Sequence, residues 1–207
     1  MDSRDVALQS VMTTVMVPRY TEMEKLDTPG NRILMAANGV WLEVCRAWLY
    51  ARVQIAPPMN IPVPYGDVTE VMQFSFGKLP RAWVAQFIEQ ARELSPNECA
   101  AWVVWNQQTN EWKLMMLEEL SVGHSHVQSN LPTLEEGEHM VIDLHSHGLL
   151  GAFFSSTDNF DDRSEVKIAG VIGNLNKPEV TTSFRLCANG VFVSLPFESS
   201  QEQKGYT

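Results

Sequence analysis

Most of this chain is divided into short apolar runs that are bounded by turn residues, a pattern typical of β-strands. Runs of this kind occur at residues 11–20, 32–35, 40–55, 71–76, 99–105, 112–117, 140–144, 166–172, 180–187 and 191–195. Asn38-Gly39 and Asn189-Gly190 supply the residues that tight hairpin turns require, so each is predicted to join two strands. The pattern therefore predicts a protein that consists largely of strands.

One segment has the period of an amphipathic helix instead. Between Leu79 and Leu94 the apolar residues recur every three or four positions, and Ser95-Pro96 ends the pattern. A second, short helix is predicted from Ser155 to about Ser164, because Ser155-Ser156-Thr157-Asp158 has the chemistry of a helix cap. Strands combined with these two helices predict an α+β, or mixed α/β, fold.

A proline-rich link at residues 57–64, followed by Gly66-Asp67, predicts a boundary within the chain. Residues 1–66 are then a β-rich N-terminal domain or extension, residues 67–198 form the main domain, and residues 199–207 are a polar tail. The first part carries no chemical motif that we can identify, so we expect the activity to lie in the second.

The composition is that of a folded, acidic protein. Of 207 residues, 44% are apolar and 19% are charged, and the formal net charge is −10. Lys and Arg are scattered, which argues against binding to nucleic acid or to an anionic membrane. No apolar run has the length of a membrane span, and no signal peptide is recognisable, so we expect a cytoplasmic protein. Its three cysteines, Cys45, Cys99 and Cys187, are expected to be reduced.

All five histidines lie between positions 124 and 147, and four of them form two His-Ser-His triplets. His145 and His147 follow a predicted strand, in which residues two apart point the same way. Ser155 and Asp158 follow, three positions apart and on one face if a helix begins there. Two imidazoles and a carboxylate are a standard ligand set for catalytic zinc, with the fourth position left for water. We therefore predict one zinc ion per chain, bound by His145, His147 and Asp158.

Each of these residues has a structural alternative. Asp158 could serve only to cap the helix, although its two oxygens allow it to cap and to bind a metal together. The other triplet, His124 and His126, has no side-chain oxygen ligand at the matching downstream positions. We interpret it as part of a polar loop at residues 121–138, with substrate contact as the alternative.

The spacing of His145, His147, Ser155 and Asp158 resembles the motif of the JAMM, or MPN-plus, metalloproteases. That family also has a glutamate after its first helix, in a Pro-x-Glu context, and Glu98 follows Pro96 in the same place. The resemblance covers about residues 70–195. It implies a curved β-sheet flanked by helices, here preceded by the smaller β-rich segment.

The resemblance also implies a reaction, the zinc-dependent hydrolysis of an amide or isopeptide bond. Glu98 would act as the general base and Ser155 would donate a hydrogen bond to the oxyanion. Without the zinc motif, Glu98 would be read as a carboxylate that closes a helix-to-strand turn. Asp143, Asp161 and Asp162 are candidates for orienting a ligand imidazole, or else solvated acids. Gly148 and Ala101 depart from the family, in which Pro and Gly often occupy those positions.

The segment at residues 143–162 resembles one bacterial subgroup more closely, the PRTRC system protein A subgroup. This implies a ubiquitin-like or sulfur-carrier-like protein as substrate and a ThiF-related activating enzyme as a possible partner. Two other functions remain open. One is a non-catalytic scaffold of the MPN type, and the other is a zinc hydrolase of a small-molecule amide conjugate.

Overall fold

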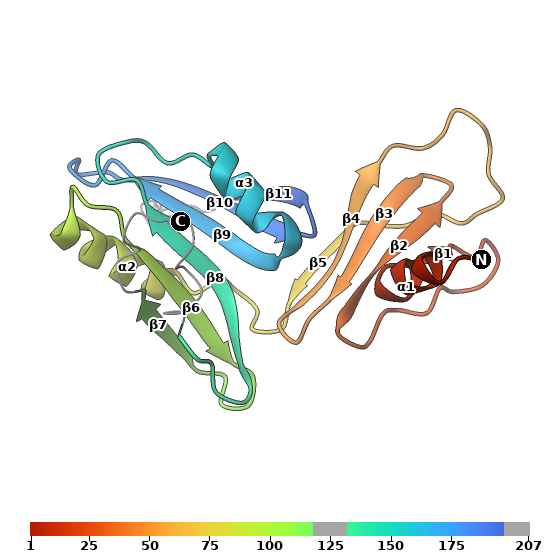
Figure 1. Ribbon diagram of the computed structural model, residues 1–207, viewed down its shortest axis with the longest axis horizontal. Helices are drawn as coiled ribbons and strands as arrows, with labels where there is room; N and C mark the ends of the chain where they lie inside the picture. The colour runs from red at the N-terminus through yellow and green to blue at the C-terminus, as the bar shows by residue number, and fades with distance from the viewer. Residues whose placement is uncertain (118–131, 197–207) are drawn as a thin grey trace, which may run out of the picture. The chain divides into compact units, whose positions relative to one another are not determined.

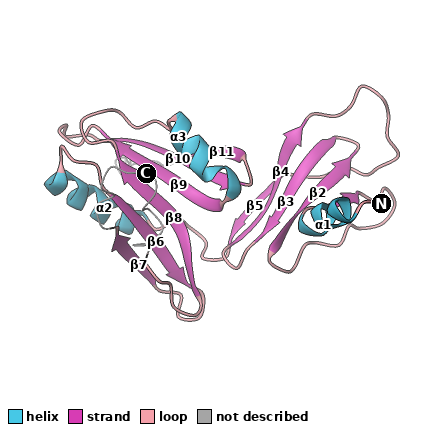
Figure 2. Cartoon of the chain, viewed as in Figure 1, coloured by secondary structure: helices cyan, strands magenta, loops and turns pink. Residues whose placement is uncertain are grey.

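The computed structural model describes residues 1–117 and 132–196 of the chain (Figure 1). The chain divides into two compact units, Met1–Leu79 and Pro80–Thr207. Strands make up most of the regular secondary structure described in each unit (Figure 2), which confirms the predicted mixed α+β class. His124, His126 and the polar tail at residues 199–207 lie outside the described residues. Every helix among the described residues is too short or too polar to cross a membrane.

The first unit contains a five-stranded sheet and one helix. Its strands lie in the order β1-β2-β3-β4-β5, with β1 parallel to β2 and the other neighbours antiparallel. The elements are α1 (Ser3–Val11), β1 (Thr13–Met16), β2 (Gly30–Ala36), β3 (Gly39–Cys45), β4 (Leu49–Ala56) and β5 (Val71–Phe74). The core of this unit includes Leu34 and Ala36 of β2 and Trp41 of β3, together with Val17 and Val68.

The division of the chain differs from the boundary expected after residue 66. After the proline-rich link the chain returns to the first sheet, where Val71 to Phe74 of β5 pair with Arg52 to Leu49 of β4. The two units therefore separate between Leu79 and Pro80. A four-residue edge strand has no local signal that assigns it to one sheet or the other, because the assignment depends on its pairing partner.

Two more elements of the first unit differ from the sequence prediction. The run at residues 40–55 is two strands, because Arg46 and Leu49 exchange backbone hydrogen bonds that turn the chain back. Residues 3–11 form a helix that the apolar pattern does not predict, since none of its residues is buried. Asp2 caps this helix by accepting a hydrogen bond of 2.9 Å from the Arg4 amide.

The first unit also buries a charged cluster around Glu43. The fully buried carboxylate of Glu43 accepts hydrogen bonds from Arg32, Arg52 and the Tyr50 hydroxyl. Burial by itself would raise the pKa of Glu43, but these donors outweigh burial and lower it. Because the four residues lie on β2, β3 and β4, the cluster ties the three central strands together.

The second unit contains a six-stranded sheet in the order β11-β10-β9-β8-β6-β7. β8 and β9 are parallel, and all other neighbours are antiparallel. The strands are β6 (Ala100–Asn106), β7 (Trp112–Met116), β8 (Glu138–Ser146), β9 (Val166–Gly173), β10 (Thr181–Ala188) and β11 (Val191–Leu195). The helices are α2 (Arg81–Leu94) and α3 (Ser156–Asp161). The hairpin predicted at Asn189-Gly190 joins β10 to β11, with both turn residues at positive φ.

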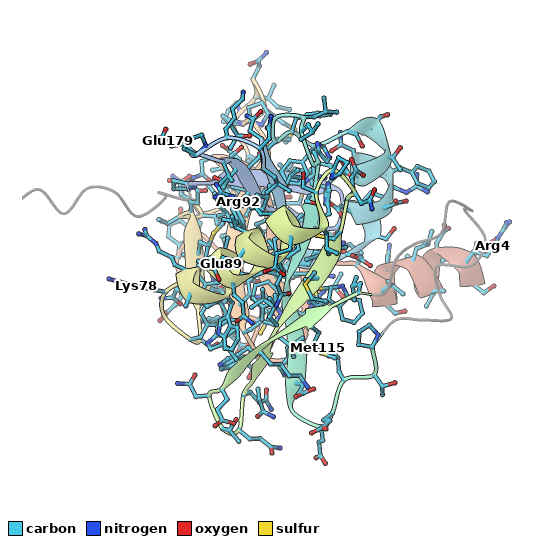
Figure 3. The ribbon with its side chains drawn as sticks, turned by 90° about the vertical axis from the view of Figure 1, so that its left-hand side faces the viewer. Arg4, Lys78, Glu89, Arg92, Met115 and Glu179 are labelled. Atoms are coloured by element: carbon cyan, nitrogen blue, oxygen red, sulfur yellow. The ribbon has the colours of Figure 1, made fainter. Side chains whose placement is uncertain are left out.

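The long predicted helix is present as α2, which buries Val84, Phe87 and Ala91 on one face. The three- or four-residue spacing of these side chains is the pattern that predicted it. Arg92, which Figure 3 labels, lies in the last turn of α2. It donates to the carbonyl oxygens of Lys177 and Pro178 at 2.9 Å each. These bonds fix the end of α2 to the turn that follows β9.

The connection between the parallel strands β8 and β9 sets the position of the candidate site. Parallel neighbours need a crossover, and here residues 147–165 provide it through α3 and the 3₁₀ turn Asp162–Ser164. As the chain leaves β8, the His147 amide donates to the Ile172 carbonyl at 2.8 Å. The crossover therefore starts beside the carboxyl end of β9.

Candidate metal centre

Three side chains from two segments of the chain converge at the carboxyl end of β8. His145 lies on β8, His147 directly follows the strand, and Asp158 lies on α3. The Nε2 atoms of the two histidines are 3.2 Å apart, and His145 Nε2 lies 3.6 Å from Asp158 Oδ1. All three donor atoms lie within 4.8 Å of one another. The structure thus brings together the residues that the sequence assigned to one ligand set.

This donor set fits a tetrahedral zinc ion. With metal–ligand bonds of about 2.0–2.1 Å, two ligands of a tetrahedron lie about 3.3–3.4 Å from each other. The observed separations of 3.2 and 3.6 Å lie on either side of that value. Two imidazoles and one carboxylate also leave a fourth position for water, as catalytic zinc sites do.

Asp158 has two structural roles at once. Its Oδ2 accepts a hydrogen bond of 2.6 Å from the Ser155 amide, and Ser155 Oγ accepts one of 3.2 Å from the Asp158 amide. This reciprocal pair is a capping box at the start of α3. Oδ1 of the same carboxylate faces His145. The two readings of Asp158, helix cap and metal ligand, are therefore compatible in this geometry.

Burial favours the neutral form of His145, which is the form that binds a metal. It has the largest effect on the pKa of this imidazole and lowers it below its ordinary value. The neighbouring His147 acts in the same direction. The Asp158 carboxylate opposes this shift but does not reverse it. A neutral imidazole has a lone pair free for a metal, so His145 is in the ligand form at neutral pH.

His147 is oriented by packing. Its side chain lies against Phe153, whose ring meets the imidazole edge-on with the centroids 4.6 Å apart. Its Nδ1 atom is buried and has no hydrogen-bond partner among the described residues. Metal-binding histidines usually donate from the second nitrogen to an acceptor. In the described part of the chain, the rings that contact this imidazole are those of Phe153 and His145.

Glu98 lies in the segment that leads from α2 into β6, next to the convergent side chains. The Ser146 amide donates to the Cys99 carbonyl at 2.9 Å, and the Cys99 amide donates to Ser146 Oγ at 3.0 Å. Ala100, the next residue, is the register partner of His145. The Glu98 side chain is exposed, and its charge is among those that act on the His145 imidazole. Glu98 is thus open to water at the edge of the centre.

A glycine holds the two histidines close to the Glu98 segment. Gly148, with φ of +52°, packs so closely that a Cβ there would lie 2.6 Å from the Pro96 carbonyl oxygen. Its own carbonyl accepts a hydrogen bond of 2.9 Å from the Leu175 amide, which keeps the loop in place. Position 148 therefore has no room for a side chain beside the Pro96 carbonyl, which explains why it is a glycine.

Gly148→Ala is expected to destabilise the second unit by roughly 1–3 kcal/mol, because alanine is strained at positive φ and its methyl group contacts the Pro96 carbonyl. The variant should also retain zinc less well, since the loop between His147 and Pro96 has to move. Denaturant unfolding and the zinc content after dialysis measure the two effects.

Gly190→Ala is the matched control. Gly190 also has a positive φ, of +85°, but the nearest atom to its Cβ position is the Arg163 carbonyl oxygen, at 3.6 Å. This variant should lose stability through backbone strain while it retains zinc like the wild type. Equal zinc loss in both variants would show that the Pro96 contact does not support the centre.

Asp143, Asp161 and Asp162, the acids considered for orienting a ligand imidazole, differ in their surroundings. Lys167 Nζ lies 2.6 Å from Asp143 Oδ2 and 2.9 Å from Asp162 Oδ1, and Asp162 also binds Arg185. Asp161 is exposed on α3. The structure thus joins Asp143 and Asp162 to a buried ammonium group, whose pKa they raise against the opposing effect of burial.

Lys167 and Arg185 are two residues near the centre that the sequence analysis missed. Both are buried, at 6% exposure each. Each one interrupts an apolar strand, Val166-Lys167-Ile168 and Phe184-Arg185-Leu186. A single charge inside such a run predicts a buried partner, so the signal was present.

The comparison with protein families agrees with this architecture. A family model described as prokaryotic homologs of the JAB domain matches residues 80–187. The chain belongs to this family. The matched residues of the JAB domain include α2, the Glu98 segment, both histidines and α3. The JAB/MPN family includes hydrolases and commonly binds zinc, and the residues that fit a metal here lie within its boundaries.

The first unit matches a different family. Residues 2–75, ahead of the JAB domain, match a family described as a domain of unknown function, DUF2016. The solution structure of protein DSY2949 from Desulfitobacterium hafniense is similar at 16% identity and a TM-score of 0.41. That similarity covers 60% of this chain and 92% of the other. A search of curated proteins finds no match.

Proposed function

We propose that this chain is a zinc-dependent hydrolase of an amide bond. The observation that carries the proposal is the convergence of His145, His147 and Asp158 in a geometry that fits zinc, beside an exposed glutamate. Membership in a family that includes hydrolases supports it. When bound, zinc would supply Lewis acidity toward water and toward the scissile carbonyl oxygen.

The side chains have distinct roles in this proposal. Glu98 accepts a proton from the attacking water and passes it to the leaving amine, while the water oxygen bonds to the carbonyl carbon and the C–N bond breaks. Ser155 Oγ already accepts a hydrogen bond from the Asp158 amide, so its own hydroxyl group is free to donate a hydrogen bond to the oxyanion. Asp158 and the two histidines hold the ion, and the capping box fixes Asp158 relative to Ser155.

For the substrate, we propose a ubiquitin-like or sulfur-carrier-like protein with an extended, glycine-rich C-terminal tail. Residues that follow His147 are exposed and apolar, with Leu149 at 52%, Leu150 at 62% and Phe153 at 50% exposure. Such a rim favours contact with a protein over a small polar conjugate. The resemblance to the PRTRC system protein A subgroup supports the same class, with a ThiF-related enzyme as the activating partner.

The sheet offers a path for such a tail. Within the described residues β7 is an edge strand of the second sheet, separated from β8 by β6. His145 pairs with Ala100 on β6, and the Ala100 carbonyl accepts a hydrogen bond of 2.9 Å from the Leu117 amide just after β7. An extended tail can add to a sheet edge through backbone hydrogen bonds, and glycines let it approach a metal closely.

The test of substrate class uses three probes with the zinc-loaded protein. They are a ubiquitin-like protein extended by a peptide at its C-terminal glycines, the same protein linked to a lysine side chain, and an aryl amide of glycine. We expect at least one protein probe to be cleaved about a hundredfold faster than the small amide, because contacts remote from the bond contribute to the transition state. Mass spectrometry of the products locates the cleaved bond.

Two other results would contradict a catalysed cleavage of a protein substrate. Turnover of the aryl amide alone would contradict a protein substrate and favour a small-molecule conjugate. If the protein retains no zinc after loading and binds the protein probes without cleaving them, a non-catalytic scaffold would be favoured instead.

A further inference from the structure

The helix that carries Asp158 lacks an apolar anchor. α3 has only six residues, all within the described part of the chain, and none of them is buried. Isolated helices of this length are unstable in water, because too few hydrogen bonds offset the cost of nucleation. Phe160, on this helix, is 60% exposed. The position of Asp158 relative to the histidines therefore has to be set by contacts other than hydrophobic packing of α3.

Arg185 makes those contacts from β10, the strand next to β11, an edge strand of the described sheet. It lies on β10, paired with Ala169 of β9 and Ser194 of β11. Its Nη1 donates to Asn159 Oδ1 on α3, and its Nη2 donates to Asp162 Oδ2 at 2.7 Å. Arg185 is buried, at 6% exposure. Arg185 thus binds the helix at the residue next to Asp158 and again at the residue that follows the helix.

The same guanidinium also holds the chain that enters the helix. Its central carbon lies 3.7 Å from the ring centroid of Phe154 and 4.0 Å from that of Phe192 on β11. Phe154 immediately precedes Ser155, which caps α3. Arg185 therefore contacts the segment before, within and after the helix.

We propose that Arg185 is a positioning residue for Asp158, which holds the carboxylate in the metal-binding geometry by fixing α3 to the sheet. This inference rests on the proposed function, because it assumes that Asp158 binds the metal. The planar guanidinium suits the task, since it can donate in two directions while its face packs on an aromatic ring. Lys167 supports it by binding the second oxygen of Asp162 at 2.9 Å.

Asn159 offers a test that leaves the buried charges in place. Its side chain is exposed, so Asn159→Ala removes the Arg185–helix hydrogen bond without opening the core. Asn159→Asp keeps an acceptor for Arg185. Thr157→Ala, at an exposed position of the same helix, is the matched control. Arg185→Lys, which retains the charge but not the planar group, is a second variant if it folds.

Two measurements separate this proposal from the proposed function. In metal-free protein, amide hydrogen exchange at residues 158–161 should be about tenfold faster in Asn159→Ala than in the wild type, because a hydrogen bond to a charged group is lost. In chelator competition, zinc should be retained roughly tenfold or more weakly. Asn159→Asp and Thr157→Ala should resemble the wild type in both measurements.

Unchanged exchange at residues 158–161 in Asn159→Ala would overturn the positioning role, whether or not the protein binds zinc. Faster exchange with unchanged zinc retention would overturn the link between helix order and Asp158. A wild-type protein that binds no zinc would contradict the proposed function, and the exchange measurement would still test the contact between Arg185 and the helix.

Discussion

Purified protein is expected to carry about one zinc ion per chain, and His145→Ala is expected to lose it. Removing one of three protein ligands should weaken binding by more than about a hundredfold, since even loss of a supporting outer contact costs 10–100-fold. Asp158→Asn should have a similar effect, because it removes the negative charge from the set. Elemental analysis after dialysis against a mild chelator measures the metal content of each variant.

Matched controls exist for both substitutions. His139 lies on β8, like His145, but at the other end of the strand, where it contacts Gln107 and Trp105. Asp161 lies on α3, like Asp158, and is exposed. His139→Ala and Asp161→Ala should retain zinc. Asp158→Asn is preferred to alanine because the amide oxygen can still accept the Ser155 backbone hydrogen bond of the capping box. Full zinc retention in both ligand variants would show that the metal site is wrongly assigned.

Glu98→Gln is expected to retain zinc and the fold while hydrolysis falls by about 10²–10⁴-fold. The amide of glutamine matches the carboxylate in shape but cannot take a proton from water. Glu98 is exposed and is not one of the three residues of the ligand cluster, so its replacement should leave the metal in place. Single-turnover kinetics on the cleaved protein probe, with zinc content measured on the same sample, give both results.

Glu93→Gln is the control for this variant. Glu93 is exposed in the last turn of α2, so the substitution makes the same chemical change a few residues before Glu98. Its turnover should equal that of the wild type. Near wild-type turnover in Glu98→Gln would mean that another group accepts the proton, and a parallel loss of zinc would mean that Glu98 supports the metal instead.

Several features of this protein could be derived from the sequence alone because their signals are local. The three- or four-residue spacing of apolar side chains predicted α2, and the Asn-Gly dipeptide predicted the turn between β10 and β11. The candidate ligand set was likewise local, since His145, His147, Ser155 and Asp158 lie within fourteen consecutive residues. Strand and helix periodicity fix the relative directions of such neighbours before any tertiary contact forms.

Other features depend on partners that are distant in the chain, and only the tertiary structure decided them. β5 belongs to the first sheet because it pairs with β4, although it follows the proline-rich link. Asp143 and Asp162 form ion pairs with the buried cations Lys167 and Arg185, respectively. The need for glycine at position 148 follows from the Pro96 carbonyl, which lies 52 residues earlier in the chain. Periodicity records which face of an element is buried, but the partner of a buried charge or a close backbone contact is determined only when the sheet is assembled.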